Sequence, residues 1–154
     1  MLASKSGNIQ TIKTLLENKA NINLKDNYGK TALMYASING NIEATNFLIK
    51  NASNVDDFDK NEWTALSWAI QKKQYDIAKA LIKGGADINH EDNEGTSLIH
   101  YAIFNESEKI IELLVNFGAN LKTKDQYGLT PLVYALKSKN KIIIDKIKSA
   151  GGRY

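Results

Sequence analysis

A 33-residue period governs this sequence. Four aspartates are separated by one such step each, and each is followed at fixed offsets by residues of similar type: Asp26, Asp59, Asp92 and Asp125. Self-similarity at a period of this length is typical of stacked repeats, in which one unit cannot bury its apolar face alone. The period divides the chain into residues 1–25, 26–58, 59–91, 92–124 and 125–154.

Residues 26–58 show what one repeat predicts. Thr31 is a good N-cap for a short helix, and Gly40 can end that helix in the left-handed conformation. A second helix is predicted from about residue 42 to 50, followed by a turn-rich link to about residue 63. Neither helix reaches the roughly 12 to 15 residues that an isolated helix needs, so neighbouring repeats must hold the pair. We therefore expect helix–turn–helix units joined by hairpin-like fingers.

Equivalent positions repeat down the chain. The predicted N-caps are Thr31, Thr64, Ser97 and Thr130. The first-helix core positions are Leu33, Leu66, Ile99 and Leu132, and one position is always alanine, at Ala36, Ala69, Ala102 and Ala135. The second-helix core positions are Leu15, Leu48, Leu81, Leu114 and Ile147. Random apolar scatter would not keep such register, which favours a repeat stack over a generic helical domain.

Some positions depart from the pattern. Glu62 stands where the other fingers have a turn glycine, and three charged residues stand where Gly7 and Gly40 end the first helix: Lys73, Glu106 and Lys139. If these backbones are left-handed, each costs roughly 1 kcal/mol relative to glycine. The sequence therefore predicts local strain in the third to fifth repeats, or turns of a different shape.

These motifs resemble the ankyrin repeat family, whose repeat has 33 residues and a T-P-L-H-x-A signature. Residues 130–135 give the closest match, residues 97–102 keep the histidine, and residues 85–89 match the Gly-Ala-Asp-Val-Asn type of ending. The resemblance implies an all-α ankyrin repeat solenoid of about five helix–turn–helix repeats with β-hairpin-like fingers. It covers nearly the whole chain, which we expect to be a single ankyrin repeat domain over residues 1–154.

The two ends differ from the middle. Residues 1–25 lack the first eight positions of a repeat, so the chain is expected to start inside a first helix. Thr11 and Thr14 replace residues that are apolar in middle repeats. The first repeat is then either a polar cap, or the first repeat of a chain that has been cut from a longer repeat array. At the other end Lys146 and Lys148 predict a C-terminal cap over residues 125–154, followed by a frayed tail at residues 151–154.

Fragments of catalytic and ligand motifs carry little weight. Residues 29–31 read Gly-Lys-Thr, as at the end of a phosphate-binding loop, but Leu24 replaces its first glycine. Asp57, Asp59 and Asn61 have the spacing of a calcium loop, but Glu62 replaces its glycine. With no cysteine there is no thiolate site. His100, at the signature position, is expected to bond to a neighbouring finger. We therefore predict a non-enzyme without a cofactor or metal.

The resemblance implies a protein-binding scaffold that uses the concave side of the fingers and first helices. The residues that stand at the variable positions of these elements are Tyr28, Lys30, Asn39, Asn61, Trp63, Lys72, Glu94, Phe104, Asn105, Tyr127 and Leu129. Aromatic residues on fingers suit an interface, since Trp and Tyr are enriched among binding hot spots. Packing on the neighbouring finger is an equal alternative for each. The helical aromatic residues are instead assigned to inward packing: Tyr35, Trp68, Tyr101 and Tyr134.

Charge and composition narrow the class of partner. The net charge is only +3, although residues 122–154 alone carry +6, and lysine greatly outnumbers the single arginine. The scarcity of arginine argues against nucleic acid as the partner, because bidentate recognition of phosphate favours arginine. No apolar run could insert in a membrane. We expect a monomer that binds an unidentified protein in the cytoplasm, with a secreted effector left open. The alternative is a targeting or structural ankyrin segment of a larger protein.

Overall fold

The computed structural model describes residues 1–154 and contains ten α-helices in five pairs. The first helices of the pairs are α1 (Leu2–Ser6), α3 (Ala32–Ile38), α5 (Ala65–Gln71), α7 (Leu98–Phe104) and α9 (Pro131–Ser138). The second helices are α2 (Ile9–Glu17), α4 (Ile42–Lys50), α6 (Tyr75–Lys83), α8 (Glu108–Asn116) and α10 (Lys141–Ser149). The links between pairs, residues 18–31, 51–64, 84–97 and 117–130, are the fingers, and in two of them an isolated β-bridge closes the loop.

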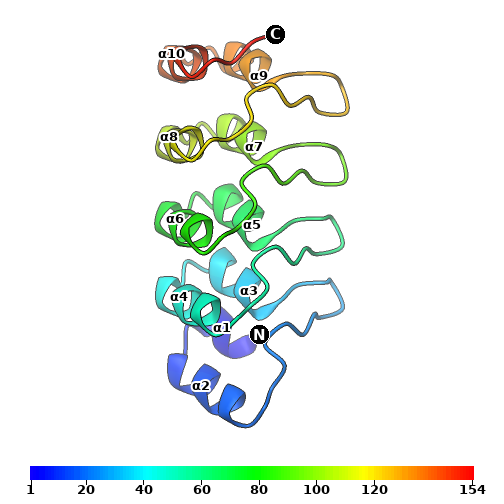
Figure 1. Ribbon diagram of the computed structural model, residues 1–154, viewed down its shortest axis with the longest axis vertical. Helices are drawn as coiled ribbons and strands as arrows, with labels where there is room; N and C mark the ends of the chain where they lie inside the picture. Colours follow the sequence, from blue (N-terminus) through cyan, green and yellow to red (C-terminus); the bar gives the residue numbers. More distant parts are fainter. The chain divides into compact units, whose positions relative to one another are not determined.

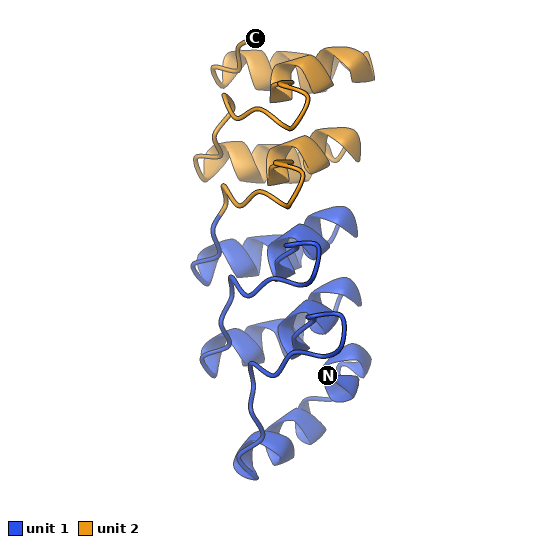
Figure 2. Ribbon diagram, turned by 90° about the vertical axis from the view of Figure 1, so that its right-hand side faces the viewer, with its two compact units in different colours: residues 1–87 blue, residues 88–154 orange.

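The helices group into two compact units, unit 1 from Met1 to Asp87 and unit 2 from Ile88 to Tyr154 (Figure 2). In unit 1 the first helices α1, α3 and α5 stack on one another, while the second helices lie beside them on the side away from the fingers (Figure 1). In unit 2, α7 packs on α9 and α8 on α10. The all-α repeat class is as predicted, and a single domain over residues 1–154 stays a prediction.

The predicted caps begin four first helices. The Thr31 hydroxyl accepts from the Met34 amide at 3.3 Å, and Thr64 and Ser67 cap each other reciprocally. Ser97 shares a capping box with His100. The last helix differs, because Thr130 precedes Pro131 and its hydroxyl donates to the Arg153 carbonyl at 2.8 Å. All four residues are N-caps, as the repeat register predicts.

Of the two alternatives for the turns that lack glycine, the structure has left-handed turns. Glu62, Lys73, Glu106 and Lys139 have φ between 51° and 60°, and the glycines at equivalent positions also have positive φ, between 70° and 81°. Gly29 shows why glycine is preferred in a finger turn, since a Cβ there would lie 3.0 Å from Asp59 Cα and Lys60 N. The charged residues therefore occupy a backbone conformation that is unfavourable for side-chain-bearing residues.

The core follows the predicted positions except at Leu15 in the first helix pair. The repeated alanines are fully buried, and Leu48, Leu81, Leu114 and Ile147 are each at most 1% exposed. Leu15, predicted to belong to the same core, is 45% exposed because no helix pair covers its face of α2.

The prediction of a frayed tail is wrong for Gly152 and Arg153. The amide of Gly152 donates to the Ile147 carbonyl at 2.9 Å, and Gly152 is buried. A Cβ on Gly152 would lie 2.5 Å from Ile147 Cγ2, so the tail needs glycine to reach α10. The bond from Thr130 to the Arg153 carbonyl then ties the tail to the start of α9.

Candidate partner-binding surfaces

One aspartate organises each finger. In the last finger, Asp125 Oδ1 accepts from the Tyr127 amide at 2.9 Å and from the Leu129 amide at 2.8 Å, while Oδ2 accepts from the Tyr134 hydroxyl at 2.5 Å. The other finger aspartates are Asp26, Asp59 and Asp92. Each accepts from the backbone amides two and four residues later and from an aromatic side chain nine residues later, which belongs to Tyr35, Trp68 or Tyr101. Each finger is thus fastened to its own first helix.

In the fingers of Asp26 and Asp125, these bonds shift the pKa values of both partners. Burial alone would raise the pKa of Asp125, but the bonds from Tyr134 and from two amides outweigh it and hold the pKa below its ordinary value. Asp26 shows the same balance with Tyr35 and the amides of Lys30 and Tyr28. The bond to Asp125 raises the pKa of Tyr134 to about 12.

The packing predicted for the helical aromatic residues is confirmed for Trp68 and Tyr134, whose rings contact those of Trp63 and His100, but it is only part of their role. All four side chains are half-buried, and their polar atoms bond to the finger aspartates. The sequence does contain a signal for this, since an aspartate precedes each of these rings by nine residues in all four repeats.

In unit 1, Lys30 joins two fingers. Its Nζ lies 3.2 Å from Asp59 Oδ2 and 4.7 Å from the centre of the Trp68 ring, and its side chain is only 17% exposed. The Trp63 ring packs against Trp68 with 4.7 Å between centroids. Lys30 and Trp63, both predicted as contact residues, thus also have internal roles.

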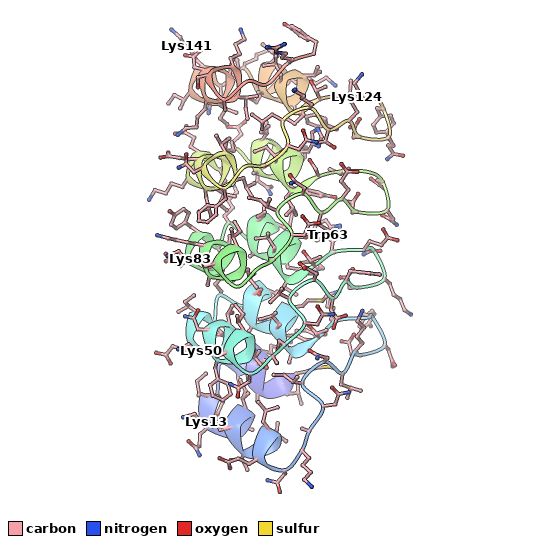
Figure 3. The ribbon with its side chains drawn as sticks, in the orientation of Figure 1. Lys13, Lys50, Trp63, Lys83, Lys124 and Lys141 are labelled. Carbon is pink, nitrogen blue, oxygen red and sulfur yellow. The ribbon has the colours of Figure 1, made fainter.

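Other predicted contact residues of unit 1 are open to solvent. Tyr28 is 67% exposed, and Asn39, Asn61 and Lys72 are exposed. Trp63 lies on the finger side of unit 1, whereas Lys13, Lys50 and Lys83 lie on the side of the second helices (Figure 3). Unit 1 therefore presents an aromatic and polar surface at its fingers.

In unit 2, His100 joins the neighbouring finger, as predicted. Its ring is buried; Nε2 lies 3.2 Å from the Leu129 carbonyl, and Nδ1 lies 2.9 Å from Ser97 Oγ. A carbonyl only accepts, so Nε2 carries the proton and Nδ1 accepts from Ser97. Burial lowers the pKa of His100, and the Asp125 carboxylate and the bond to Leu129 oppose this only in part. The histidine is a neutral structural link.

The predicted contact residues of unit 2 fall into two groups. Phe104 and Tyr127 are each 74% exposed, and Glu94 is exposed. Asn105 and Leu129 are half-buried, and the backbone of Leu129 bonds to both Asp125 and His100. Two large aromatic side chains are therefore available to a partner in this unit.

The motif fragments are accounted for by the same contacts. Of the Gly-Lys-Thr run, Lys30 bonds to Asp59 and Thr31 caps α3. Asp57 pairs with Lys25 at 3.4 Å, and Asp59 accepts from finger amides. No group of three or more acidic or histidine side chains is placed to hold a metal ion. None of the ten helices has the length and apolar character needed to cross a membrane.

The repeat geometry agrees with a family comparison. A model of ankyrin repeats in three copies matches residues 1–92 and 84–149. The chain belongs to the ankyrin repeat family. A search of curated proteins found no similar sequence. Ankyrin repeats are generally protein–protein interaction modules, so this ankyrin repeat protein is of a class that binds proteins.

Proposed function

We propose that this ankyrin repeat protein is a non-catalytic scaffold that binds a partner protein through its fingers and first helices. The observation that carries the proposal is the exposure of Tyr28, Phe104 and Tyr127 at variable positions of otherwise well-buried repeats. Large apolar side chains with few rotatable bonds gain contact area at a small entropic cost. Such residues are typical anchors of an interface.

The rigidity of the fingers supports the same function. Each finger aspartate fixes two backbone amides and one helical ring before any partner arrives. A surface that is already ordered loses little conformational entropy on binding. Tyr28 and Tyr127 lie within two such turns and their amides donate to Asp26 and Asp125, so their backbones are held in place.

The proposed contact residues fall into one set in each unit. Those of unit 1 are Tyr28, Asn39, Asn61, Trp63 and Lys72, and those of unit 2 are Glu94, Phe104, Asn105 and Tyr127. We assign Lys30 and Leu129 to positioning, because Lys30 bonds to Asp59 and the Leu129 backbone bonds to Asp125 and His100. The proposed partner is a protein inside the cell, and the scaffold is a monomer.

Alanine substitution of the exposed aromatic residues tests the proposal. Proteins captured from source lysate would be quantified for wild type, Tyr28→Ala, Phe104→Ala and Tyr127→Ala. Loss of a hot-spot residue is expected to weaken affinity by roughly tenfold or more. The thermal melt is expected to stay nearly unchanged, because the side chains are exposed.

The control is Lys50→Ala with Lys83→Ala, two residues on the second-helix side of unit 1 (Figure 3). This variant is expected to capture the same proteins as wild type. Equal capture by the three aromatic variants, with unchanged melting, would place the binding surface elsewhere. Weaker capture by the lysine control alone would move it to the second helices.

A further inference from the structure

Helix α4 lies between α2 and α6 in the layer of second helices of unit 1 (Figure 1). Both α4 and α6 have nine residues and stand at equivalent repeat positions, so α6 is an internal reference for α4. The buried apolar side chains of α6 are Ile77, Ala78, Leu81 and Ile82. Those of α4 are only Ala44 and Leu48. Fewer buried apolar side chains therefore anchor α4 than anchor α6.

The remaining buried residue of α4 is polar. Thr45 is fully buried, and its hydroxyl has no hydrogen-bond partner within the protein. The residues at the equivalent position of the other repeats are all apolar: Ile12, Ala78, Ile111 and Ile144. A hydroxyl that loses its bonds to water on folding, and gains none in return, weakens the folded state relative to an apolar side chain of the same shape.

The turn after α4 departs from the other repeats in two further ways. Ser53 is 9% exposed, and its hydroxyl also lacks a partner within the protein. The equivalent residues have no polar side chain: Ala20, Ala86, Ala119 and Gly152. Ala52 has φ of 61°, whereas the turn after α6 has glycine there, at Gly85. A Cβ disfavours this left-handed backbone, so both departures weaken the turn.

The outer edge of α4 is also incompletely packed. A groove of about 380 Å³ separates α4 from α6 on this side, and its lining includes Ile49 and Ala80. Ala80 stands where α4 has Phe47 and α8 has Leu113, so a small side chain replaces a large one at this junction. The α4–α6 contact therefore does not compensate for the weak core of α4.

We propose that α4, with its N-cap and the turn after it, opens locally from unit 1 because of these departures, while α1, α3 and α5 stay folded. The opening segment is residues 41–53. The first helices contact one another directly, so their stack does not depend on α4 alone. The proposed opening lies on the second-helix side and is independent of the partner-binding surface proposed above.

Local opening has a consequence for α1. The Asn41 side chain holds the end of that helix, because its Nδ2 donates to the Ser4 and Lys5 carbonyls at 2.8 and 3.0 Å. Both bonds are lost when residues 41–53 open. The segment therefore acts as a conformational device that controls how firmly α1 is held, without a change in the fingers.

Native-state amide exchange at pH 7, corrected for intrinsic rates, compares the helices. Amides of α4 are expected to exchange at least about tenfold faster than the equivalent amides of α6 and than those of α3. Low concentrations of urea are expected to accelerate exchange in α5 more than in α4, since local opening exposes less surface than unfolding of the whole unit. Equal rates in α4 and α6, or in α4 and α3, overturn the proposal.

Repair variants test the cause of the opening. Thr45→Val keeps the shape of the side chain and removes its hydroxyl, and Ser53→Ala removes the second one. Each is expected to slow exchange in α4 at least about fivefold. The double variant is expected to melt about 3 °C or more above wild type. If neither variant slows α4, the hydroxyls are satisfied in solution and the proposal is overturned.

Ala86→Ser is the matched control, because it buries a hydroxyl at the same position after α6. It is expected to lower the melting temperature by about 3 °C but to leave exchange in α4 unchanged within about twofold, because Ser53 and α4 open while the turn after α6 stays folded. Exchange in α4 that accelerates along with the loss of melting temperature would mean that α4 opens only when the whole fold does, and would overturn the proposal.

Discussion

Unit 1 and unit 2 join neighbouring fingers by the same backbone hydrogen bond but by different side chains. In unit 1 the Lys60 amide donates to the Tyr28 carbonyl, and in unit 2 the Gln126 amide donates to the Glu94 carbonyl, both at 3.1 Å. In addition to these bonds, unit 1 has the charged pair of Lys30 and Asp59, at 3.2 Å, whereas unit 2 has the buried neutral ring of His100 against the Leu129 carbonyl.

The difference shows that neighbouring repeats can be joined by side chains at different repeat positions and of different chemistry. A buried histidine must be neutral to remain in place, so its contribution depends on pH. Two units with the same backbone are therefore expected to respond differently to acid, salt and substitution.

The largest expected effect is the loss of a finger aspartate. Asp125→Ala removes the acceptor of two amides and of the Tyr134 hydroxyl, and is expected to lower the free energy of unfolding by about 3 kcal/mol. Asp59→Ala also leaves the Lys30 ammonium without its counter-ion, so a loss of about 4 kcal/mol is expected. Urea denaturation at pH 7 measures both. A smaller loss for Asp59→Ala than for Asp125→Ala would mean that the charged link adds nothing to unit 1.

Acid is expected to weaken unit 2 before unit 1. Burial holds the pKa of His100 below its ordinary value, so the unfolded chain takes up the proton first. The contribution is complete above about pH 6.5 and is lost as pH falls toward the folded pKa, at no more than about 1.4 kcal/mol per pH unit. Amide exchange in α9 and α3 at pH 7.5 and 5.5, corrected for intrinsic rates, measures the two units separately.

His100→Gln is the matched control for this titration. Glutamine can still cap α7 from the third position and can donate to the Leu129 carbonyl, but it does not titrate. The variant is expected to remove the acid sensitivity of unit 2 while keeping most of its protection at pH 7.5. If α9 of the variant is weakened by acid as much as that of wild type, the pH response belongs to other groups.

The ends of the first helices offer a smaller difference. In unit 1 two of the three such turns have glycine, at Gly7 and Gly40, whereas in unit 2 both turns have charged residues, Glu106 and Lys139, with φ of 51° and 59°. Lys139→Gly is expected to stabilise unit 2 by about 1 kcal/mol, because the side-chain strain of the left-handed backbone is removed. Gly40→Ala should destabilise unit 1 by a similar amount. Thermal melts of both variants, with exposed Lys137→Gly inside α9 as a destabilising control, check the prediction.

How well the sequence predicts a feature of this protein depends on how far apart in the chain the interacting residues lie. Thr64 as an N-cap was predictable, because it depends on the few residues around it. The left-handed turn at Lys73 was one of two alternatives that the sequence left open. The link from His100 to the next finger followed from its signature position. Burial at Leu15 was predicted wrongly, because the period assigns a residue to a face without showing what covers that face.

The candidate surfaces were predictable only in part. Exposure of Tyr28 and Tyr127 follows from their variable positions on a finger. The pairing of Lys30 with Asp59 was not predicted, since it joins side chains 29 residues apart in different repeats. The bonds from helical rings to finger aspartates were missed for a different reason, because polar atoms on an aromatic ring do not appear in an apolar pattern.

The smallest expected effect concerns the ring that fastens each finger, where unit 1 has Trp68 on Asp59 and unit 2 has Tyr134 on Asp125. Tyr134→Phe removes one hydrogen bond and is expected to cost about 0.5 to 1 kcal/mol at pH 7.

The folded pKa of Tyr134 is about 12, above its ordinary value of 10.0, so the bond stabilises unit 2 fully below pH 10 and is lost as pH rises toward 12. The indole N–H of Trp68 does not titrate in this range. The difference in unfolding free energy between wild type and Tyr134→Phe should therefore shrink from pH 9 to pH 11.5, while Trp68→Phe keeps a constant difference. Equal shrinkage for both variants would show that alkali acts on the fingers through some group other than Tyr134.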